Sequence, residues 1–314
     1  MFRYTLKRAS LAAGVVAMTL LLLVIAIRLV PGDPAAAIMG PRATPELRAA
    51  IEARMGLDQP IPVQYGRFLW STLQGDLGRD VRSERPITAI IGEKLPHTLA
   101  LIAASMAWAV ALGIVLGLLA ALRPGSPADR TIGTISIVTI SIPPFVVALL
   151  LMLVFSVHLG VMPAIGAGDP GDAVDQLWHL VLPSVALGLG WVGYVARLLR
   201  TSLLEAMAQA HFRTAVAYGL PPLRLYGSYA LRLAIVPVVT VLGVGIGAMV
   251  SGAVLVEIVF SRPGIGSLIY ESVVTRNYPV LLGAVLVTTA LYAAVMLLAD
   301  LVTALLDPRV RRAL

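Results

Sequence analysis

The chain has 314 residues, of which 58% are hydrophobic and 13% charged, with a formal net charge of +7 and no cysteine. Soluble domains carry about 45–50% apolar and about 25% charged residues, so this composition excludes an ordinary soluble protein and is typical of a lipid-embedded helix bundle. The lack of cysteine excludes disulfides, thiolate zinc sites, iron–sulfur clusters and a cysteine nucleophile.

Six stretches are long and apolar enough to cross a bilayer, which takes about 20 residues in a helix. The first is preceded by cations like a signal peptide, but it is too long for one and no small-residue cleavage site follows, so we interpret it as a retained anchor. We therefore predict an all-α membrane protein with six transmembrane helices. The predicted spans cover residues 9–30, 98–122, 132–159, 180–199, 234–259 and 280–306.

The long segment between the first two spans is expected to form a small folded element outside the bilayer. A helix-start pattern at residues 44–46 precedes apolar residues at helical spacing, and Gly56 fits a C-terminal cap. A second short helix is expected over residues 63–73, ending before Gly75. Residues 39–41 carry the composition of a turn.

The positive charge is unevenly distributed between alternate loops. With a cytoplasmic N-terminus, the cytoplasmic pieces carry 13 Lys or Arg against three acids. The loop over residues 159–180, on the other side, has three Asp and no Lys or Arg. Because cations in short loops set orientation, both termini are predicted to be cytoplasmic. The excess of positive charge is thus explained by membrane topology, and the sequence shows no clustered basic surface of the kind that binds nucleic acid.

The cytoplasmic connection between spans four and five, residues 197–232, is unusually long. It has helical runs on both sides of Gly219, Pro221 and Pro222, which force a break because glycine permits a left-handed cap and proline cannot continue a helix. Periodicity alone favours an interfacial helix that anchors the loop. The same helix–turn–helix shape also suits docking into a groove on a partner protein.

Several short motifs, each present once, follow one another along nearly the whole chain. They are L-x-P-G-D-P-A at 29–35, G-L-D-x-P-x-x-x-Q-Y at 56–65, G-D-L-G at 75–78, R-x-S-x-L-E at 200–205, R-T-A-x-A-x-G-L at 213–220, A-L-R-x-A-x-x-P-V at 230–238, E-x-x-F-S-x-P-G-x-G at 257–266 and A-L-L-D-P-R at 304–309. This set resembles the membrane subunits of binding-protein-dependent ABC importers, in the dipeptide, oligopeptide and nickel permease family. The loop is less charged than usual there, with Ala210, Val216 and Tyr218 in place of an acid, a base and a lysine.

The resemblance implies a type I importer transmembrane domain over residues 95–307, a first helix with a small extracytoplasmic loop domain over 1–94, and a cytoplasmic tail over 308–314. It places a coupling helix at about 213–222, which would receive the motion of the ATPases. Glu205 is expected to cap a helix or to pair with Arg200 or Arg213. The ATPase-coupling residues are then Arg213, Thr214, Ala215, Gly219, Leu220, Pro221 and Glu205.

The resemblance also implies partners and cargo. A homologous second permease subunit, two cytoplasmic nucleotide-binding ATPases and an extracytoplasmic solute-binding protein would complete an importer for di- or oligopeptides, or related solutes such as nickel chelates, in the bacterial inner membrane. The chain has no phosphate-binding loop, so it is predicted not to be an enzyme. No cofactor is expected on it, since ATP and magnesium would bind the partner ATPases.

The translocation path is harder to place from sequence. Candidate path or gate residues are Ser141, Pro143, Pro144, Met249, Ser251, Glu257 and Phe260, with residues 260–266 re-entering the membrane as an outer gate by analogy. The prolines indicate either a packing kink or a cavity-lining break, and the glycines of span five indicate close helix packing. No metal-ligand spacing is present. A secondary transporter or an intramembrane enzyme would need ionisable groups in mid-span, and none is obvious.

Overall fold

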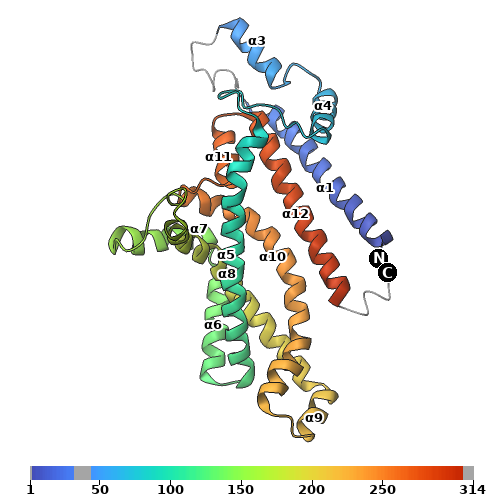
Figure 1. Ribbon diagram of the computed structural model, residues 1–314, viewed down its shortest axis with the longest axis vertical. Helices are drawn as coiled ribbons and strands as arrows, with labels where there is room; N and C mark the ends of the chain where they lie inside the picture. Colours follow the sequence, from blue (N-terminus) through green and yellow to red (C-terminus); the bar gives the residue numbers. More distant parts are fainter. Residues whose placement is uncertain (1, 32–43, 307–314) are drawn as a thin grey trace.

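The computed structural model describes residues 2–31 and 44–306 (Figure 1). Its longest helices run along the long axis of the molecule. Helices suit a bilayer because each backbone polar group is hydrogen-bonded within its own segment. They are α1 (Phe2–Leu29), α5 (Ile87–Leu122), α8 (Ala173–Ala208), α10 (Leu231–Val259) and α12 (Tyr278–Leu306). All five are long and apolar enough to cross a membrane, α10 together with the residues just before it.

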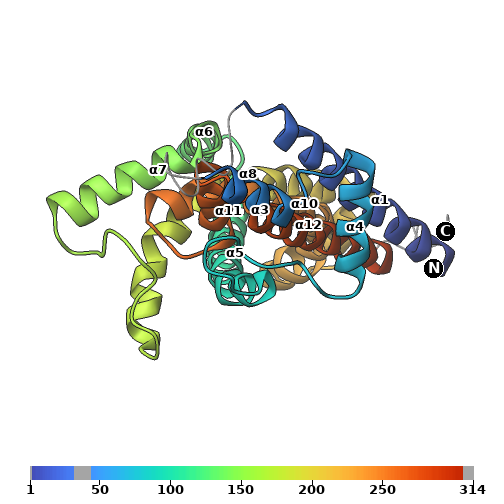
Figure 2. The ribbon, with the colours of Figure 1, turned by 90° about the horizontal axis from the view of Figure 1, so that it is seen from above.

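The predicted third span is present as two helices with a sharp bend between them, and the prolines that indicated a kink or a break lie at that bend. It consists of α6 (Pro127–Ser141) and then α7 (Pro144–Leu151), which continues as the π-helix η1 (Met152–His158) after a bend of 99°. The backbone is extended at Ile142 and Pro143, with ψ angles of 123° and 141°. Prolines disfavour a helical residue before them, which explains the break. Figure 2 shows α7 leaving the bundle on the side opposite α1 and α4.

Helix α8 lies at the centre of the bundle and packs against α5, α6, α7 and α10, while α12 packs against α10 and α1. Small residues permit these close approaches. A Cβ on Gly113 would lie 2.7 Å from Val195 of α8, and one on Gly247 would lie 2.1 Å from the Tyr292 ring of α12. The prediction that the glycine face of span five mediates helix packing is confirmed.

One end of the molecule, hereafter the α3–α4 end, carries α3 (Pro45–Arg54) and α4 (Ile61–Leu73), with the short helix α11 (Ile265–Val274) nearby (Figure 1). Both helices were predicted, and Gly56 takes the left-handed φ of +67° that a C-terminal cap requires. Arg28 at the end of α1 donates to the Gln59 carbonyl and to Gln64 Oε1, 3.3 Å away. The predicted turn at residues 39–41 lies outside the described residues.

The opposite end, hereafter the α9 end, carries α9 (Ala210–Ala217) and the π-helix η2 (Leu223–Ala230), which runs directly into α10 (Figure 1). The predicted helix, break and second helix are all present, and the break lies at residues 218–221. Residues 307–314, which include the predicted cytoplasmic tail and part of the last motif, lie outside the described residues.

Candidate functional site

Helix α9 is held against the bundle by one face only. Phe212 and Ala215 are buried, and they join Leu203 of α8, Leu225 of η2 and other side chains in one apolar cluster. The opposite face is exposed and carries Arg213, Thr214, Val216 and Tyr218, with 82% of Tyr218 accessible. The helix therefore combines a fixed inner face with an outer face available to a partner.

The turn after α9 is a Schellman motif, which ends a helix by satisfying its last carbonyls. The Leu220 N–H donates to the Ala215 carbonyl, and the Gly219 N–H donates to the Val216 carbonyl, 2.9 Å away. Gly219 has a φ of +70°, a conformation that costs an L side chain energy. Leu220 then turns back onto the apolar cluster, and Pro221 accepts the first hydrogen bonds of η2. The turn thus fixes the position of α9 relative to α10.

The coupling residues predicted from sequence do not all face outward. Arg213, Thr214, Gly219 and Pro221 are exposed, whereas Ala215 is buried and acts by packing. Glu205 is exposed and forms no hydrogen bond or ion pair within residues 2–31 and 44–306, so its expected capping or pairing role is not seen.

Arg200 pairs with Asp129 of α6, so its expected pairing with Glu205 is wrong. Its Nε and Nη2 atoms both donate to the buried carboxylate, with Nη2 2.7 Å from Oδ2. Asp129 also accepts from the Gly125 N–H at 2.8 Å, and Ser126 caps the same helix turn. Sequence reasoning missed this link between α6 and α8. A serine followed three residues later by an acid signals the start of α6, but it does not identify Arg200 as the partner of Asp129.

Glu257 joins three helices where α10 meets α11. Its side chain is fully buried, and Oε1 accepts from the Thr98 hydroxyl of α5 at 2.6 Å while Oε2 accepts from the Ser267 N–H of α11 at 3.1 Å. The Thr98 oxygen accepts from the Ile265 N–H at 2.8 Å. A carboxylate is favourable at a helix N-terminus, where free N–H groups gather. A Cβ at position 264 would lie 2.0 Å from the Glu257 carboxylate, so a larger residue there would displace that side chain from its present position.

Three of the predicted path or gate residues lie inside the chain. Glu257, Phe260 and Met249 are buried within its own core in this conformation, and their role in a path or gate stays a prediction. The Phe260 carbonyl accepts from the Gly166 N–H at 2.8 Å, which covers the turn between α10 and α11. Helix α11 packs on α10, α12 and α5. Burial on a helix depends on which neighbours cover each face, and sequence alone does not reveal them.

Other predicted path residues do lie on the surface. Ser141 and Pro143 are exposed at the bend between α6 and α7, and Pro144 is half-buried there. Ser251 belongs to an exposed stripe of α10 at helical spacing, hereafter the α10 stripe. Its members are Thr240, Val244, Ala248, Ser251 and Leu255.

Comparisons with known proteins agree with this architecture. The profile of the family described as "Binding-protein-dependent transport system inner membrane component" matches residues 113–312, and the profile of its N-terminal part matches residues 1–102. The chain is 35% identical over 309 residues to a probable peptide ABC transporter permease of Sinorhizobium fredii, covering 98% of this chain and 99% of that protein. It is 36% identical over 311 residues to the glutathione transport system permease GsiC of Salmonella paratyphi A, covering 99% of each.

Among solved structures, the methionine ABC transporter MetNI in an inward-facing conformation matches with a TM-score of 0.59 at 19% identity, over 70% of this chain and 97% of that chain. At this identity the match supports the fold alone. The family profiles and the two relatives cover nearly the whole chain. The chain therefore belongs to the binding-protein-dependent transport system inner membrane components, as the non-catalytic, multi-pass permease subunit of an ABC importer.

Proposed function

We propose that this chain is one of two permease subunits of an ATP-driven importer for short peptides. Peptide and glutathione are the cargoes in the names of its relatives, and glutathione is itself a small peptide. A homologous second permease, two ATPases and a solute-binding protein complete the importer. Cargo passes between the two permeases along exposed surfaces such as the α10 stripe and the bend at Ser141 and Pro143.

The proposal assigns the α9 end to the cytoplasm and the α3–α4 end to the outer side. Five arginines, at positions 197, 200, 213, 224 and 232, lie on the chain around the α9 end, with Glu205 as the acid among them. The loop over residues 159–180, between η1 and α8, carries three Asp and no cation. The asymmetry of cations in short loops supports this orientation, with both termini cytoplasmic.

The observation that carries the proposal is the two-faced α9 with its Schellman turn. The exposed face with Tyr218 and Arg213 docks into a groove of an ATPase. When the ATPase pair closes on ATP, α9 is displaced, and the apolar cluster beneath it moves α8 and α10 because packed interiors deform little. This motion switches the permease pair between inward-open and outward-open arrangements. The chain itself performs no chemistry.

Two glycine substitutions test the coupling role of the turn. Gly219 and Gly227 are both exposed, and a Cβ on either would have no heavy atom within 4 Å, but only Gly219 has a positive φ. Gly219→Val should therefore distort the turn without a steric clash, because a β-branched residue avoids this conformation. We expect at least a tenfold loss of ATP-driven peptide uptake in proteoliposomes for Gly219→Val and little loss for Gly227→Val. Equal uptake by the two variants would sink the coupling assignment.

A further inference from the structure

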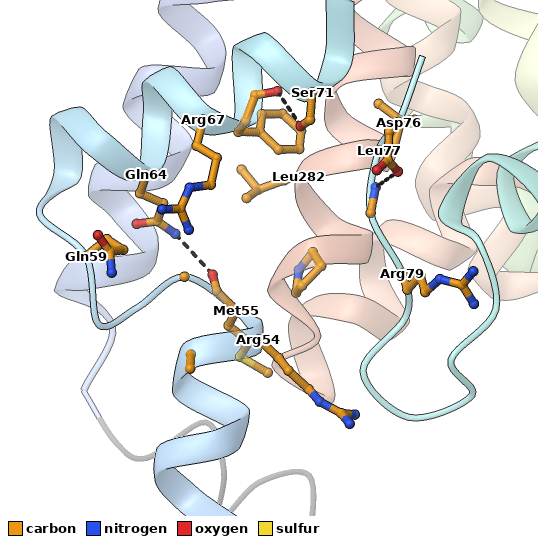
Figure 3. Close-up of a pocket in the computed structure, with 15 residues that line it drawn as sticks. Arg54, Met55, Gln59, Gln64, Arg67, Ser71, Asp76, Leu77, Arg79 and Leu282 are labelled. Carbon is orange, nitrogen blue, oxygen red and sulfur yellow. Dashed lines mark hydrogen bonds between the residues drawn. The ribbon is translucent and has the colours of Figure 1, made fainter. Parts of the chain in front are cut away.

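A cavity of about 230 Å³ lies at the α3–α4 end, between the two short helices and the start of α12. Figure 3 shows Arg54 at the end of α3 and Met55 directly after it on one side, Gln64 and Arg67 from α4 above, and the segment with Asp76 and Arg79 on the far side. Leu282 of α12 lies between them. The cavity therefore joins the extramembrane helices to a transmembrane helix.

The lining of this cavity is positively charged. Three arginines line it against one acid, Asp76, which already accepts a hydrogen bond from the Gly78 N–H at 2.8 Å. Arg54 pairs with Glu84 at 3.0 Å, and Arg79 donates to the Glu84 carbonyl at 3.1 Å. Arg67 forms no hydrogen bond or ion pair with any residue that the structure describes. Among the three arginines, only Arg67 therefore has no bond to a described residue, which leaves its guanidinium available to an incoming anion.

The size of the cavity decides what it can hold. Small-molecule sites usually measure about 300–1,000 Å³, so 230 Å³ is small for a whole peptide cargo and suits one side chain. Met55, Phe68 and Leu282 give it apolar walls beside the guanidinium. Such a lining matches the short aliphatic stem and charged tip of Asp or Glu. A partner's side chain that fills a pocket and pairs with a charge inside it anchors an interface, although aromatic and Arg anchors are commoner.

We propose that this cavity receives an acidic side chain of the solute-binding protein when that protein docks on the importer. The inference rests on the proposed function, which places the α3–α4 end on the outer side where the solute-binding protein works. Arg67 forms the charge-assisted hydrogen bonds to the incoming carboxylate. Because the cavity floor is Leu282 of α12, the anchor contacts a helix that packs against both α1 and α10.

The test uses the complete importer in proteoliposomes and titrates its cognate solute-binding protein while ATP hydrolysis is measured. Arg67→Glu should raise the half-stimulating concentration of the binding protein about tenfold or more, since it replaces attraction by repulsion. Basal ATPase activity and the maximal stimulated rate should stay unchanged. Arg82→Glu is the matched control, because Arg82 is exposed in the same outer segment and does not line the cavity.

Ionic strength gives a second readout. The half-stimulating concentration for the wild type should rise with added salt more steeply than that for Arg67→Glu, because salt screens exposed charges. The inference is overturned if Arg67→Glu behaves like Arg82→Glu, if it lowers only the maximal rate, or if its effect follows the anionic lipid content without any change in binding-protein dependence. Failure of the proposed function differs, since the wild-type importer itself would then show no ATP-driven uptake.

Discussion

The two ends of the molecule are attached to different pairs of transmembrane helices. The apolar cluster beneath α9 joins it to α8 and α10. The α3–α4 end rests on α1 and α12 through a second cluster that contains Ile51 and Met55, and through polar bonds such as that from the Tyr65 hydroxyl to the Ala17 carbonyl at 2.9 Å. If the proposed function holds, a movement imposed at either end reaches a different pair of helices first.

The separate helix pairs meet at α10, which packs against α12 through Gly243 and Gly247 and against α11 through Glu257. The comparison leads us to expect that coupling across the membrane, if the proposed function holds, depends on the contacts of α10 with α12 and α11. Variants at the α9 end, at these contacts and at the α3–α4 end should therefore have different effects.

The largest effect is expected from Ala215→Glu at the α9 end. It places an uncompensated charge inside the apolar cluster, which is strongly unfavourable. We expect α9 to detach, with ATP-driven uptake lost and the ATPases no longer co-purifying. Val216→Glu, on the exposed face, should keep the fold and the attachment of α9, so thermal unfolding in detergent should separate the two variants. If both variants unfold at the same temperature, α9 is not held through this inner face.

The next largest effect is expected from Glu257→Leu, where α10 meets α11. It leaves the Thr98 hydroxyl and the Ser267 N–H without their acceptor, at about 1.5–3 kcal/mol for each charge-assisted bond. Thermal unfolding in detergent should show a stability loss of about 3 kcal/mol or more. Glu257→Gln should lose less because it keeps one acceptor, and the exposed Glu271→Leu should lose little. If Glu257→Leu unfolds at the same temperature as the wild type, Glu257 does not hold α10, α11 and α5 together.

A smaller loss is expected from Asp129→Ala, which removes the partner of Arg200 between α6 and α8. Arg200 is partly exposed, so solvent screens the pair and we expect about 1–2 kcal/mol. A double-mutant cycle with Arg200→Ala measures the pair itself. Additive losses in that cycle would show that the two side chains do not stabilise each other.

The smallest effect concerns Asp80 at the α3–α4 end. Burial raises the pKa of Asp80, but hydrogen bonds from Ser83, the Arg82 N–H and Asn277 outweigh it and hold the pKa below its usual value. The group therefore stabilises the fold above the unfolded pKa of about 3.9, and this contribution is lost as pH falls through the lower folded pKa. Hydrogen exchange should show residues 76–86 loosening below about pH 4 before residues 210–217. Asp80→Asn should remove the difference.

Local chemistry predicted the elements at both ends of the molecule. Gly219 with two following prolines, and Gly56 after a helical run, specify turns through backbone preferences that hold in any surroundings. The bend of 99° was not predictable, because prolines fix where a helix breaks but not the direction of the chain afterwards.

Long-range contacts were beyond sequence reasoning. Asp129 and Arg200 lie 71 positions apart, and Thr98 and Glu257 lie 159 apart. Only packing brings these pairs together. The same limit explains why the burial of Glu257 and Met249 could not be predicted from the sequence.

The central claim is that the exposed face of α9 docks on an ATPase while the α3–α4 end stays outside. The chain has no cysteine, so single-cysteine variants can be labelled without background. Tyr218 and Leu73 are both 82% exposed, at opposite ends of the molecule. Tyr218→Cys should react with an impermeant thiol reagent from the cytoplasmic side and become protected when the ATPases assemble. Leu73→Cys should react only from the outer side and ignore the ATPases. Unchanged reactivity of Tyr218→Cys on assembly would contradict the account.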